Sequence, residues 1–354
     1  MSKTPFSPES WEKYYTEIGL DRVTQEQYLI YVRNCYKNKI PPIFELEHLS
    51  LLVGIEYIEL RSMIFGTHRF YRKFKIRKKR GGFREISAPL PSLLSVQQWI
   101  NENILSKVKI SICATGFRPR KSILTNAKIH CNRRTILKVD LSDFFPSIDI
   151  RRVIGVFREL GYPANVAVAM ARLCCENGKL PQGSAASPAL ANIICRGLDL
   201  RLYQLSKKNK LRYTRYADDI ALSGDKIAPG IRKLIFEIIS DEGFKINNEK
   251  IRFLDEDDSK IITGLDISSG TPRVTRSYRR DLKRDIYFVW SSGLANHLSR
   301  RRIFEPNYLE VLSGRLRFWE FIEPQSTQML QCKSRLSETF KLHGEYQSRQ
   351  QRSA

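Results

Sequence analysis

The stretch LRYTRYADDIALSG, residues 211–224, decides the fold, because it has the pattern of two short strands joined at an acidic turn. Residues 211–216 are rich in tyrosine and threonine, and residues 220–223 are mostly apolar, as expected of paired strands. Asp218 and Asp219 lie at the turn between them. Acidic pairs in turns are usually solvated, so this pair alone does not define a site.

A second strand also ends in an acidic residue. TILKVDL, residues 135–141, is apolar and β-branched enough for a buried strand, and the polar turn SDFFPSID follows Asp140. If the two segments are neighbours in an antiparallel sheet, Asp140, Asp218 and Asp219 meet at one edge. Because such carboxylates repel one another, we expect two Mg²⁺ ions, about 3.5 to 4 Å apart, to hold them together. The backbone carbonyl of Leu141 is a further candidate ligand, and Mn²⁺ is an alternative ion.

The order of elements around these strands predicts an α+β fold. Helical spacing of apolar residues follows the first strand at 150–160, 163–178 and from Pro188 onward, and a further helix starts at Pro229. FKINNEK (244–250) and KIITGLDIS (260–268) have the pattern of short strands. Residues 135–268 therefore predict a strand-helix-strand-strand-helix-strand unit, the split βαβ or ferredoxin-like sheet.

Segments of different character flank this unit. Residues 1–60 have a helical pattern with an aromatic stripe, which we interpret as packing, interrupted by Pro41 and Pro42. Residues 69–84 hold nine Lys or Arg, no acid and a Gly81–Gly82 turn, which indicates a basic β-hairpin. Residues 276–354 carry 15 Lys or Arg against 8 acids in helical patterns.

Charge favours a nucleic-acid partner. The 354 residues hold 60 Lys or Arg and 37 Asp or Glu, a net charge of +23. No stretch approaches the roughly 18 apolar residues of a membrane span, and the N-terminus lacks the pattern of a secretory signal, so we expect a cytoplasmic protein without membrane contact. Seven cysteines form no CxxC pair and five scattered histidines form no ligand pair, so neither disulfides, zinc nor a histidine-based metal site is expected.

Five motifs in order resemble the successive palm motifs of reverse transcriptases over residues 69 to 270: DLSDFFPSI (140–148), LPQGSAASPALAN (180–192), YADD (216–219), EGFKINNEK (242–250) and ITGLDIS (262–268). The resemblance implies a right-hand polymerase. Its parts would be an N-terminal helical region at 1–68, fingers at 69–134, a ferredoxin-like palm at 135–275 with fingers helices at about 150–200, and a helical thumb at 276–354.

The resemblance also implies roles for single residues. Asp140, Asp218 and Asp219 match the metal-binding aspartates. Phe145 matches a steric gate whose ring would exclude a ribose 2′-OH, whereas neighbouring Phe144 suits a core position. The remaining expected nucleotide contacts are Gln182, Gly183, Arg84, one of Lys78 and Lys79, and Lys250 as a candidate proton donor to pyrophosphate. A nonspecific phosphate patch is the alternative for the basic residues of the hairpin.

Shorter signals resemble the bacterial retron group. TNAKIH has the NAxxH pattern with Asn126 and His130, and Ile262–Thr263–Gly264 resembles the VTG triplet. IICRGLD and TRYADD also resemble sequence contexts of that group. The RNA-binding residues implied are Asn126, His130, Thr263, Gly264, Arg300, Arg301, Arg315 and Arg317, the four arginines having a solvated helix face as their alternative.

Membership of the retron group would imply a defined chemistry and set of partners. A structured noncoding RNA would serve as template and primer, a guanosine 2′-OH would attack the first dNTP, and the product would be a branched RNA-DNA (msDNA). We expect a host RNase H to remove template, because the 79 residues after 275 are too few for a further nuclease domain, and a separately encoded effector to act with the chain in antiphage defence. The alternatives are a reverse transcriptase of a group II intron or diversity-generating element, and a noncatalytic RNA-binding scaffold.

Overall fold

The computed structural model describes residues 7–77 and 81–353, and its N-terminal part is helical as predicted. α1 (Pro8–Glu17) and α2 (Arg22–Lys37) begin at Ser7 and Asp21, whose side chains accept hydrogen bonds from backbone N–H groups of the first turns. After Pro41 and Pro42 come α3 (Leu46–Val53) and α4 (Tyr57–Phe65). α3 ends at Gly54 with a φ of 70°, a conformation that glycine adopts without strain.

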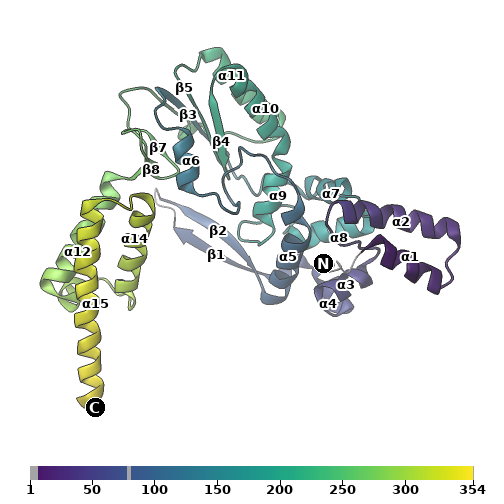
Figure 1. Ribbon diagram of the computed structural model, residues 1–354, viewed down its shortest axis with the longest axis horizontal. Helices are drawn as coiled ribbons and strands as arrows, with labels where there is room; N and C mark the ends of the chain where they lie inside the picture. The colour runs from purple at the N-terminus through teal and green to yellow at the C-terminus, as the bar shows by residue number, and fades with distance from the viewer. Residues whose placement is uncertain (1–6, 78–80, 354) are drawn as a thin grey trace. The chain divides into compact units, whose positions relative to one another are not determined.

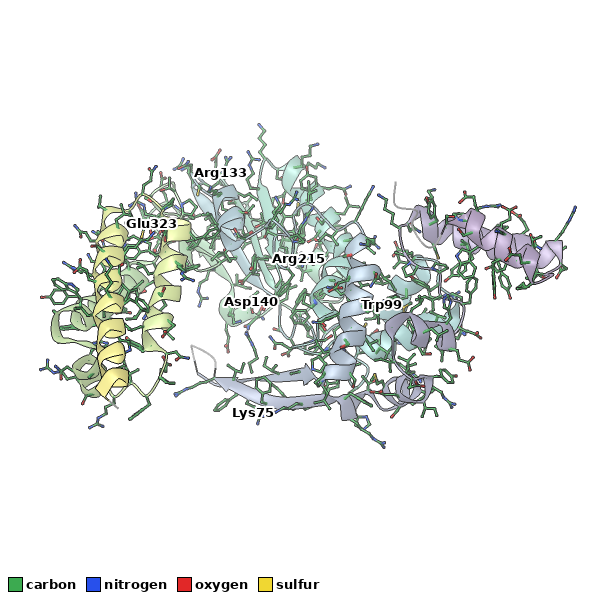
Figure 2. All side chains as sticks on the ribbon, turned by 60° about the horizontal axis from the view of Figure 1, so that its bottom comes forward. Lys75, Trp99, Arg133, Asp140, Arg215 and Glu323 are labelled. Carbon is green, nitrogen blue, oxygen red and sulfur yellow. The ribbon has the colours of Figure 1, made fainter. Side chains whose placement is uncertain are left out.

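The predicted basic hairpin is confirmed. β1 (Tyr71–Arg77) and β2 (Phe83–Pro89) pair antiparallel from Tyr71 with Pro89 to Arg77 with Phe83. α5 (Pro91–Asn103) follows β2 and packs against it (Figure 1). Most side chains of the hairpin are exposed, so its positive charge faces solvent, as Lys75 does in Figure 2.

The strand pattern around the acidic turn produces the predicted split βαβ sheet. β3 (Thr135–Asp140), β4 (Arg212–Tyr216), β5 (Asp219–Gly224) and β6 (Arg252–Leu254) form one sheet in the order β4-β5-β3-β6. Its helices in chain order are α7 (Ile150–Glu159), α8 (Ala164–Cys174), α9 (Ser187–Ile194), α10 (Arg196–Lys208) and α11 (Pro229–Asp241). β3 lies between β6 and the β4–β5 hairpin, which is the strand order of a split βαβ sheet.

Three local predictions were wrong. Residues 244–250 form no strand: Ile246 makes one isolated antiparallel bridge with Leu141, a 3₁₀ turn covers Asn248–Lys250, and the strand comes later as β6. The second helix ends at Cys174, short of Gly178. The third helix divides at Cys195 into α9 and α10, so Leu198 belongs to the second piece.

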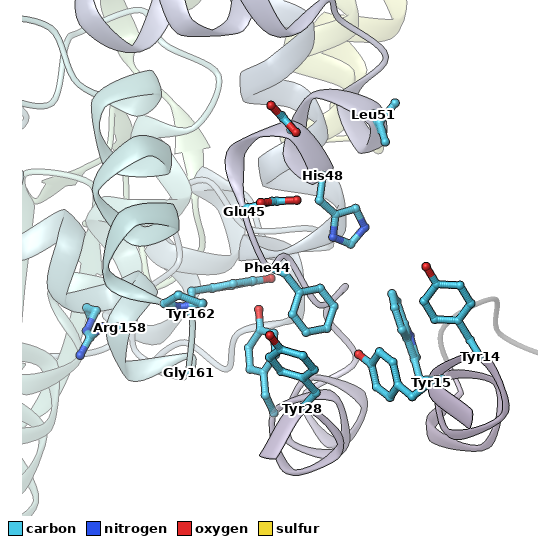
Figure 3. A pocket seen from close by; sticks show the side chains of 14 residues that line it. Tyr14, Tyr15, Tyr28, Phe44, Glu45, His48, Leu51, Arg158, Gly161 and Tyr162 are labelled. Carbon is cyan, nitrogen blue, oxygen red and sulfur yellow. The ribbon is translucent and has the colours of Figure 1, made fainter. Parts of the chain in front are cut away.

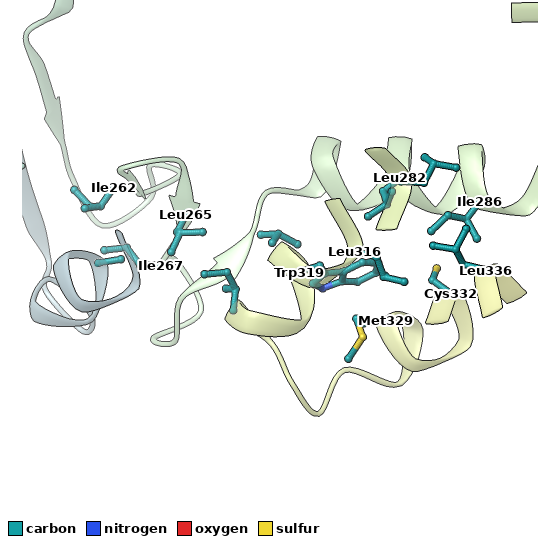
Figure 4. Packing of buried hydrophobic residues seen from close by; sticks show 14 of the residues in the cluster. Ile262, Leu265, Ile267, Leu282, Ile286, Leu316, Trp319, Met329, Cys332 and Leu336 are labelled. Atoms are coloured by element: carbon teal, nitrogen blue, oxygen red, sulfur yellow. The ribbon is translucent and has the colours of Figure 1, made fainter. Parts of the chain in front are cut away.

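The C-terminal helices build a core of their own with the small sheet β7 (Ile261–Ile262), β8 (Leu265–Asp266) and β9 (Arg273–Val274). The helices are α12 (Arg276–Ser292), α13 (Leu294–Arg301), α14 (Tyr308–Ile322) and α15 (Thr327–Ser353). Trp319 is fully buried among Leu316, Met329 and Cys332 (Figure 4). α6 (Ile123–Ile129) contributes Ala127 to the same core. Buried apolar area therefore stabilises this part of the chain.

The chain divides into two compact units that are discontinuous in sequence. One comprises Met1–Pro119, Lys138–Ile220 and Ile227–Ile251, and the other Arg120–Leu137, Ala221–Lys226 and Arg252–Ala354. The boundaries predicted for fingers, palm and thumb describe functional parts and stay predictions. All seven cysteines are free and all but Cys131 are buried. Within residues 7–77 and 81–353, none of the helices has the length and apolarity needed to cross a bilayer.

Candidate active site

The three predicted aspartates line one pocket. Asp140 ends β3, Asp218 lies in the turn after β4, and Asp219 begins β5. The backbone N–H of Leu141 donates to the carbonyl of Asp218 at 3.1 Å, which holds the end of β3 beside the turn. The pocket has a volume of about 720 Å³, and its walls include all three aspartates with Leu141 and Lys250. The sequence prediction that these carboxylates gather at one sheet edge agrees with this geometry.

The two turn carboxylates are held in surroundings that disfavour their charge. Burial, followed by the charges of Asp219 and Asp140, raises the pKa of Asp218 to about 6. Burial also raises the pKa of Asp219, against the opposing charges of Lys138 and Lys250. Two carboxylates with raised pKa values beside a third indicate a site that takes positive charge.

Lys250 supplies part of that charge in this structure. Its Nζ donates to Asp140 Oδ1 at 2.7 Å, and the lysine side chain is 48% exposed while that of Asp140 is 13% exposed. The 3₁₀ turn at Asn248–Lys250 and the hydrogen bond from Asn247 N to the Asp140 carbonyl, at 2.8 Å, fix this segment against β3. The backbone that precedes Lys250 is therefore hydrogen-bonded to Asp140, the same residue that the Lys250 side chain contacts.

The donor set fits a hard divalent cation. Carboxylate oxygens with a backbone carbonyl are ligands that Mg²⁺ and Mn²⁺ prefer. Burial and the charges of Asp219 and Asp140 raise the pKa of Asp218, and a bound cation would offset this cost of its negative charge. Across the described ranges, no group of three or more His, Cys, Asp or Glu side chains is arranged to hold a metal ion. Lys250 meanwhile engages Asp140. The residues that would hold an ion are Asp140, Asp218 and Asp219, with the Leu141 carbonyl.

Most of the expected nucleotide contacts line the pocket, and Gly183 does not. Arg84 on β2, Phe145 and Gln182 line the pocket with the aspartates, and Arg84 is exposed. Phe145 is half-buried, whereas Phe144 is 4% exposed, as predicted for a core residue. The φ of Gly183 is 129°, and a Cβ there would lie 2.6 Å from the Ser87 carbonyl oxygen, so glycine is needed for close packing on β2 rather than for approach to a ligand. Lys78 and Lys79 lie outside the described residues.

Phe117 is a pocket residue that the sequence did not predict. The ring of Phe117 lies 6.0 Å from that of Phe145 and 6.5 Å from that of Tyr216, and Phe117 has a φ of 55°. It follows Gly116, where a Cβ would come within 2.8 Å of the Ala217 nitrogen. Glycine at position 116 therefore allows this segment to pack closely against the acidic turn. In the sequence, the Gly116–Phe117 pair was the only sign that Phe117 lies near the site.

A buried ion pair beneath the turn was also missed. Arg215 and Asp199 have fully buried side chains and meet through two hydrogen bonds of 2.8 Å (Arg215 is labelled in Figure 2). Arg215 Nη1 further donates to Asn192 Oδ1 at 3.1 Å and to the Ala217 carbonyl at 3.2 Å. The sequence contexts IICRGLD and TRYADD each supply one partner, so the pair joins two stretches that the sequence had marked only as resemblances.

The structure argues against direct RNA contact for two of the motif residues. Asn126 is 2% exposed and His130 is fully buried. His130 Nδ1 lies 2.7 Å from Ser223 Oγ, and burial, followed by the charge of Arg133, lowers the pKa of His130 to about 3. Asn126 Nδ2 donates to Thr263 Oγ1 at 3.4 Å. The prediction that Asn126 and His130 bind RNA is corrected: both side chains stabilise the packing of α6. Thr263 and Gly264 both have positive φ, and Gly264 is exposed.

The four predicted arginines of the C-terminal helices divide in the same way. Arg300 and Arg301, which end α13, and Arg317 on α14 are exposed. Arg315 instead donates to Asp285 at 3.2 Å and lies over the Tyr278 ring at 5.5 Å from its centroid. Three of the four guanidinium groups are therefore accessible, while the fourth is held by its own helices.

Comparison with known proteins agrees with the site. Residues 76–269 match the family described as reverse transcriptase (RNA-dependent DNA polymerase). The chain is 34% identical over 255 residues to the Retron Ec86 reverse transcriptase of Escherichia coli, which covers 71% of this chain and 80% of that protein. It is 36% identical over 274 residues to the Retron Mx65 reverse transcriptase of Myxococcus xanthus, covering 70% of this chain and 64% of that one. It is 30% identical over 326 residues to the Retron Mx162 enzyme of the same organism, covering 81% and 66%. The chain therefore belongs to the retron reverse transcriptases, which are RNA-directed DNA polymerases with the right-hand fold.

Proposed function

We propose that this polymerase makes a branched RNA-DNA molecule, msDNA, by two-metal nucleotidyl transfer primed at a guanosine 2′-OH of a structured noncoding RNA. The observation that carries nucleotidyl transfer is the pocket in which Asp140, Asp218 and Asp219 meet, where burial, followed by the two neighbouring carboxylates, raises the pKa of Asp218 to about 6. Family membership supports the branched product, because retron enzymes are the relatives that the chain matches over most of its length.

The aspartates and the Leu141 carbonyl are the proposed ligands of two Mg²⁺ ions. Bound there, the ions would lower the pKa of the attacking hydroxyl and neutralise the leaving pyrophosphate. The chain's own contribution is placement: β3 and the β4–β5 turn hold the carboxylates at one sheet edge before any ligand arrives. Lys250 has to leave Asp140 when cations take its place, and its ammonium group is then free beside the reacting phosphates as the proposed proton donor.

The walls of the pocket suit a deoxynucleoside triphosphate. Arg84 presents a guanidinium that can grip phosphate oxygens through two hydrogen bonds, and it projects from a hairpin with no competing acid except Glu85 on β2. Gln182 provides an amide in the same pocket, and its backbone carbonyl accepts a hydrogen bond from Ser87 N of β2 at 2.9 Å. Phe145, supported by the Phe117 ring at 6.0 Å, is the proposed steric gate against a 2′-OH. Lys78 and Lys79 remain candidates for a second phosphate contact.

The proposed RNA surface uses exposed groups of the C-terminal helices. Arg300, Arg301 and Arg317 are exposed, and Gly264 is exposed in a tight turn where RNA backbone could approach closely. Arg315 is left out of this surface because Asp285 and Tyr278 engage it. The charge of Arg315 instead pairs with Asp285 and so stabilises the packing of α14 on α12.

The biological setting is proposed from family membership. The chain would act in the cytoplasm with its noncoding RNA, a host RNase H that removes template from the cDNA, and a separately encoded effector in antiphage defence.

The product tests this proposal directly. Cells that express the chain together with its flanking DNA should accumulate a small single-stranded DNA whose 5′ end is joined to RNA by a 2′,5′ bond. Treatment with a 2′,5′ debranching enzyme should release the DNA, and Asp218→Asn should abolish it. An unbranched cDNA that is indifferent to debranching would instead favour a group II intron or diversity-generating enzyme.

A further inference from the structure

A second pocket, separate from the active site, lies among the N-terminal helices. Its volume is about 990 Å³, and it shares no lining residue with the pocket of the aspartates. Most of its wall is aromatic, and its lining includes Trp11, Tyr14, Tyr15, Tyr28, Tyr31 and Phe44. Figure 3 shows the rings of Tyr14, Tyr15, Tyr28 and Phe44 from close by. The polymerase chemistry assigns no role to these side chains.

The rings contact one another at their edges and leave aromatic surface open. Trp11 lies 5.3 Å from Phe44 and 5.6 Å from Tyr15 between ring centroids, in tilted arrangements. Tyr15 and Tyr28 are tilted at 5.7 Å. Tyr14 is 49% exposed and Tyr28 is 42% exposed. The stripe that the sequence predicted as packing therefore packs on one side and lines a cavity on the other.

Two carboxylates of this pocket, Glu45 and Glu47, are available as hydrogen-bond acceptors. Glu45 occupies the N-cap position of α3 yet makes no capping hydrogen bond, and Glu45 and Glu47 are exposed. Among residues 7–77 and 81–353, the ion pairs of this region are Lys13 with Glu17 and Arg33 with Glu26, and neither includes Glu45 or Glu47. The buried hydroxyl of Tyr15 has no hydrogen-bond partner among the described residues.

Charge separates this region from the rest of the chain. Residues 1–60 contain nine Asp or Glu and six Lys or Arg, a net charge of −3, in a chain whose total is +23. Arg158 is the one Lys or Arg among the described lining residues. A phosphate backbone would thus meet two carboxylates here, whereas the rest of the molecule attracts it.

We infer that this pocket binds a guanidinium group, an arginine side chain presented by a partner protein. Aromatic faces attract a cation placed over them, and a guanidinium stacks on rings while donating five hydrogen bonds and accepting none. The carboxylates of Glu45 and Glu47 are acceptors that such a donor satisfies. A nucleotide, whose base carries both donors and acceptors and which brings a phosphate, fits this set less well. The inference does not depend on the branched product or on the metal site.

Binding of a short peptide tests the chemistry. The probe is acetyl-Gly-Arg-Gly-amide, and its matched control replaces arginine by citrulline, which has nearly the same shape without the charge. Calorimetry with the full chain should show binding of the arginine peptide and at least about tenfold weaker binding of the citrulline peptide. Background attachment is small, because the remainder of this +23 chain repels cations.

Two double variants of equal charge locate the site. Glu45→Gln with Glu47→Gln should weaken the arginine peptide by at least about tenfold, while Glu56→Gln with Glu59→Gln, outside the pocket, should leave it unchanged. Primer extension on an RNA template should be the same in all three proteins, which shows that they are folded. Equal binding of the two peptides, equal loss in both double variants, or displacement of the peptide by AMP would overturn the proposal.

Discussion

Asp218 is a half-buried carboxylate with two other carboxylates beside it, and this arrangement destabilises the fold when no cation is bound. Its pKa is raised to about 6, above the ordinary value of 3.8. As the pH rises from 4 to 6 the unfolded chain gives up this proton first, so the free energy of unfolding falls, and the full penalty is present at pH 7. We predict that Asp218→Asn raises the free energy of unfolding at pH 7.5 by about 1 to 3 kcal/mol in chelator.

Thermal melting between pH 4 and pH 8 measures this effect. The advantage of Asp218→Asn should shrink as the pH falls through 6 toward 4, and added Mg²⁺ should stabilise only the wild-type protein. Asp225→Asn is the matched control, because Asp225 is exposed and does not line the pocket. An Asp218→Asn protein that melts below wild type at pH 7.5 would show that the carboxylate is well solvated.

The adjacent phenylalanines provide a second test on single residues. Phe145 lines the pocket and is half-buried, whereas Phe144 is 4% exposed and packs on Phe244. Phe145→Val should raise incorporation of ribonucleotides relative to deoxyribonucleotides by at least about tenfold, with little change in stability. Phe144→Ala should lower the free energy of unfolding by about 3 to 5 kcal/mol without changing that ratio. Single-nucleotide extension with dNTP and rNTP, beside urea unfolding, separates the two outcomes; the reverse assignment would refute the gate.

Among the structural elements, the hairpin of β4 and β5 depends on a buried charge beneath its turn. Arg215 joins Asp199 of α10 to the carbonyl of Ala217, which has a φ of 57° and directly precedes Asp218. Tyr213 donates to the same Asp199 carboxylate at 2.7 Å. Because all these groups are buried, removing one partner leaves the other charge without compensation.

We predict that Arg215→Gln lowers the free energy of unfolding by about 3 to 5 kcal/mol. Arg196→Gln, which breaks the exposed pair with Glu159, should cost less than about 1 kcal/mol. Urea unfolding of both variants checks the difference. Comparable losses would mean that the Asp199 carboxylate is rehydrated in the variant.

Local patterns predicted most of these elements. The strand ending at Asp140, the hairpin at 211–224 and the helix from Pro229 were predicted because each has its own periodicity and turn residues. The segment 244–250 was wrongly predicted as a strand. In the structure it makes only one bridge, between Ile246 and Leu141, and the sequence carries no periodic signal that distinguishes a single bridge from a strand. Apolar alternation cannot distinguish it from β6, which is formed a few residues later.

The site was predicted in part for the same reason. Three aspartates at strand ends were expected to converge, and they line one pocket. The contact of Lys250 with Asp140, the Phe117 ring and the Arg215–Asp199 pair join residues 16 to 110 positions apart, so only the folded chain reveals them. Burial of His130 was likewise hidden, since its partner Ser223 is 93 positions away.

On the scale of the whole molecule, the +23 charge should dominate RNA affinity. We predict that RNA binding weakens by at least about 100-fold between 50 and 200 mM salt, since each neutralised phosphate releases counterions. Arg300→Gln with Arg301→Gln should make this dependence shallower, while Arg315→Gln should mainly lower stability, because Asp285 engages that side chain. Filter binding over a salt series provides the slopes. A steeper or unchanged slope in the Arg300/Arg301 variant would place RNA elsewhere.

The most direct test of the account is primer extension on an RNA template with dNTPs and Mg²⁺. We predict that Asp218→Asn combined with Asp219→Asn reduces the rate by at least about 100-fold, because the ligands that hold the catalytic cations are lost, while Asp225→Asn extends primers as wild type does. Wild-type extension by the Asp218/Asp219 variant would contradict the assignment of the active site to these carboxylates.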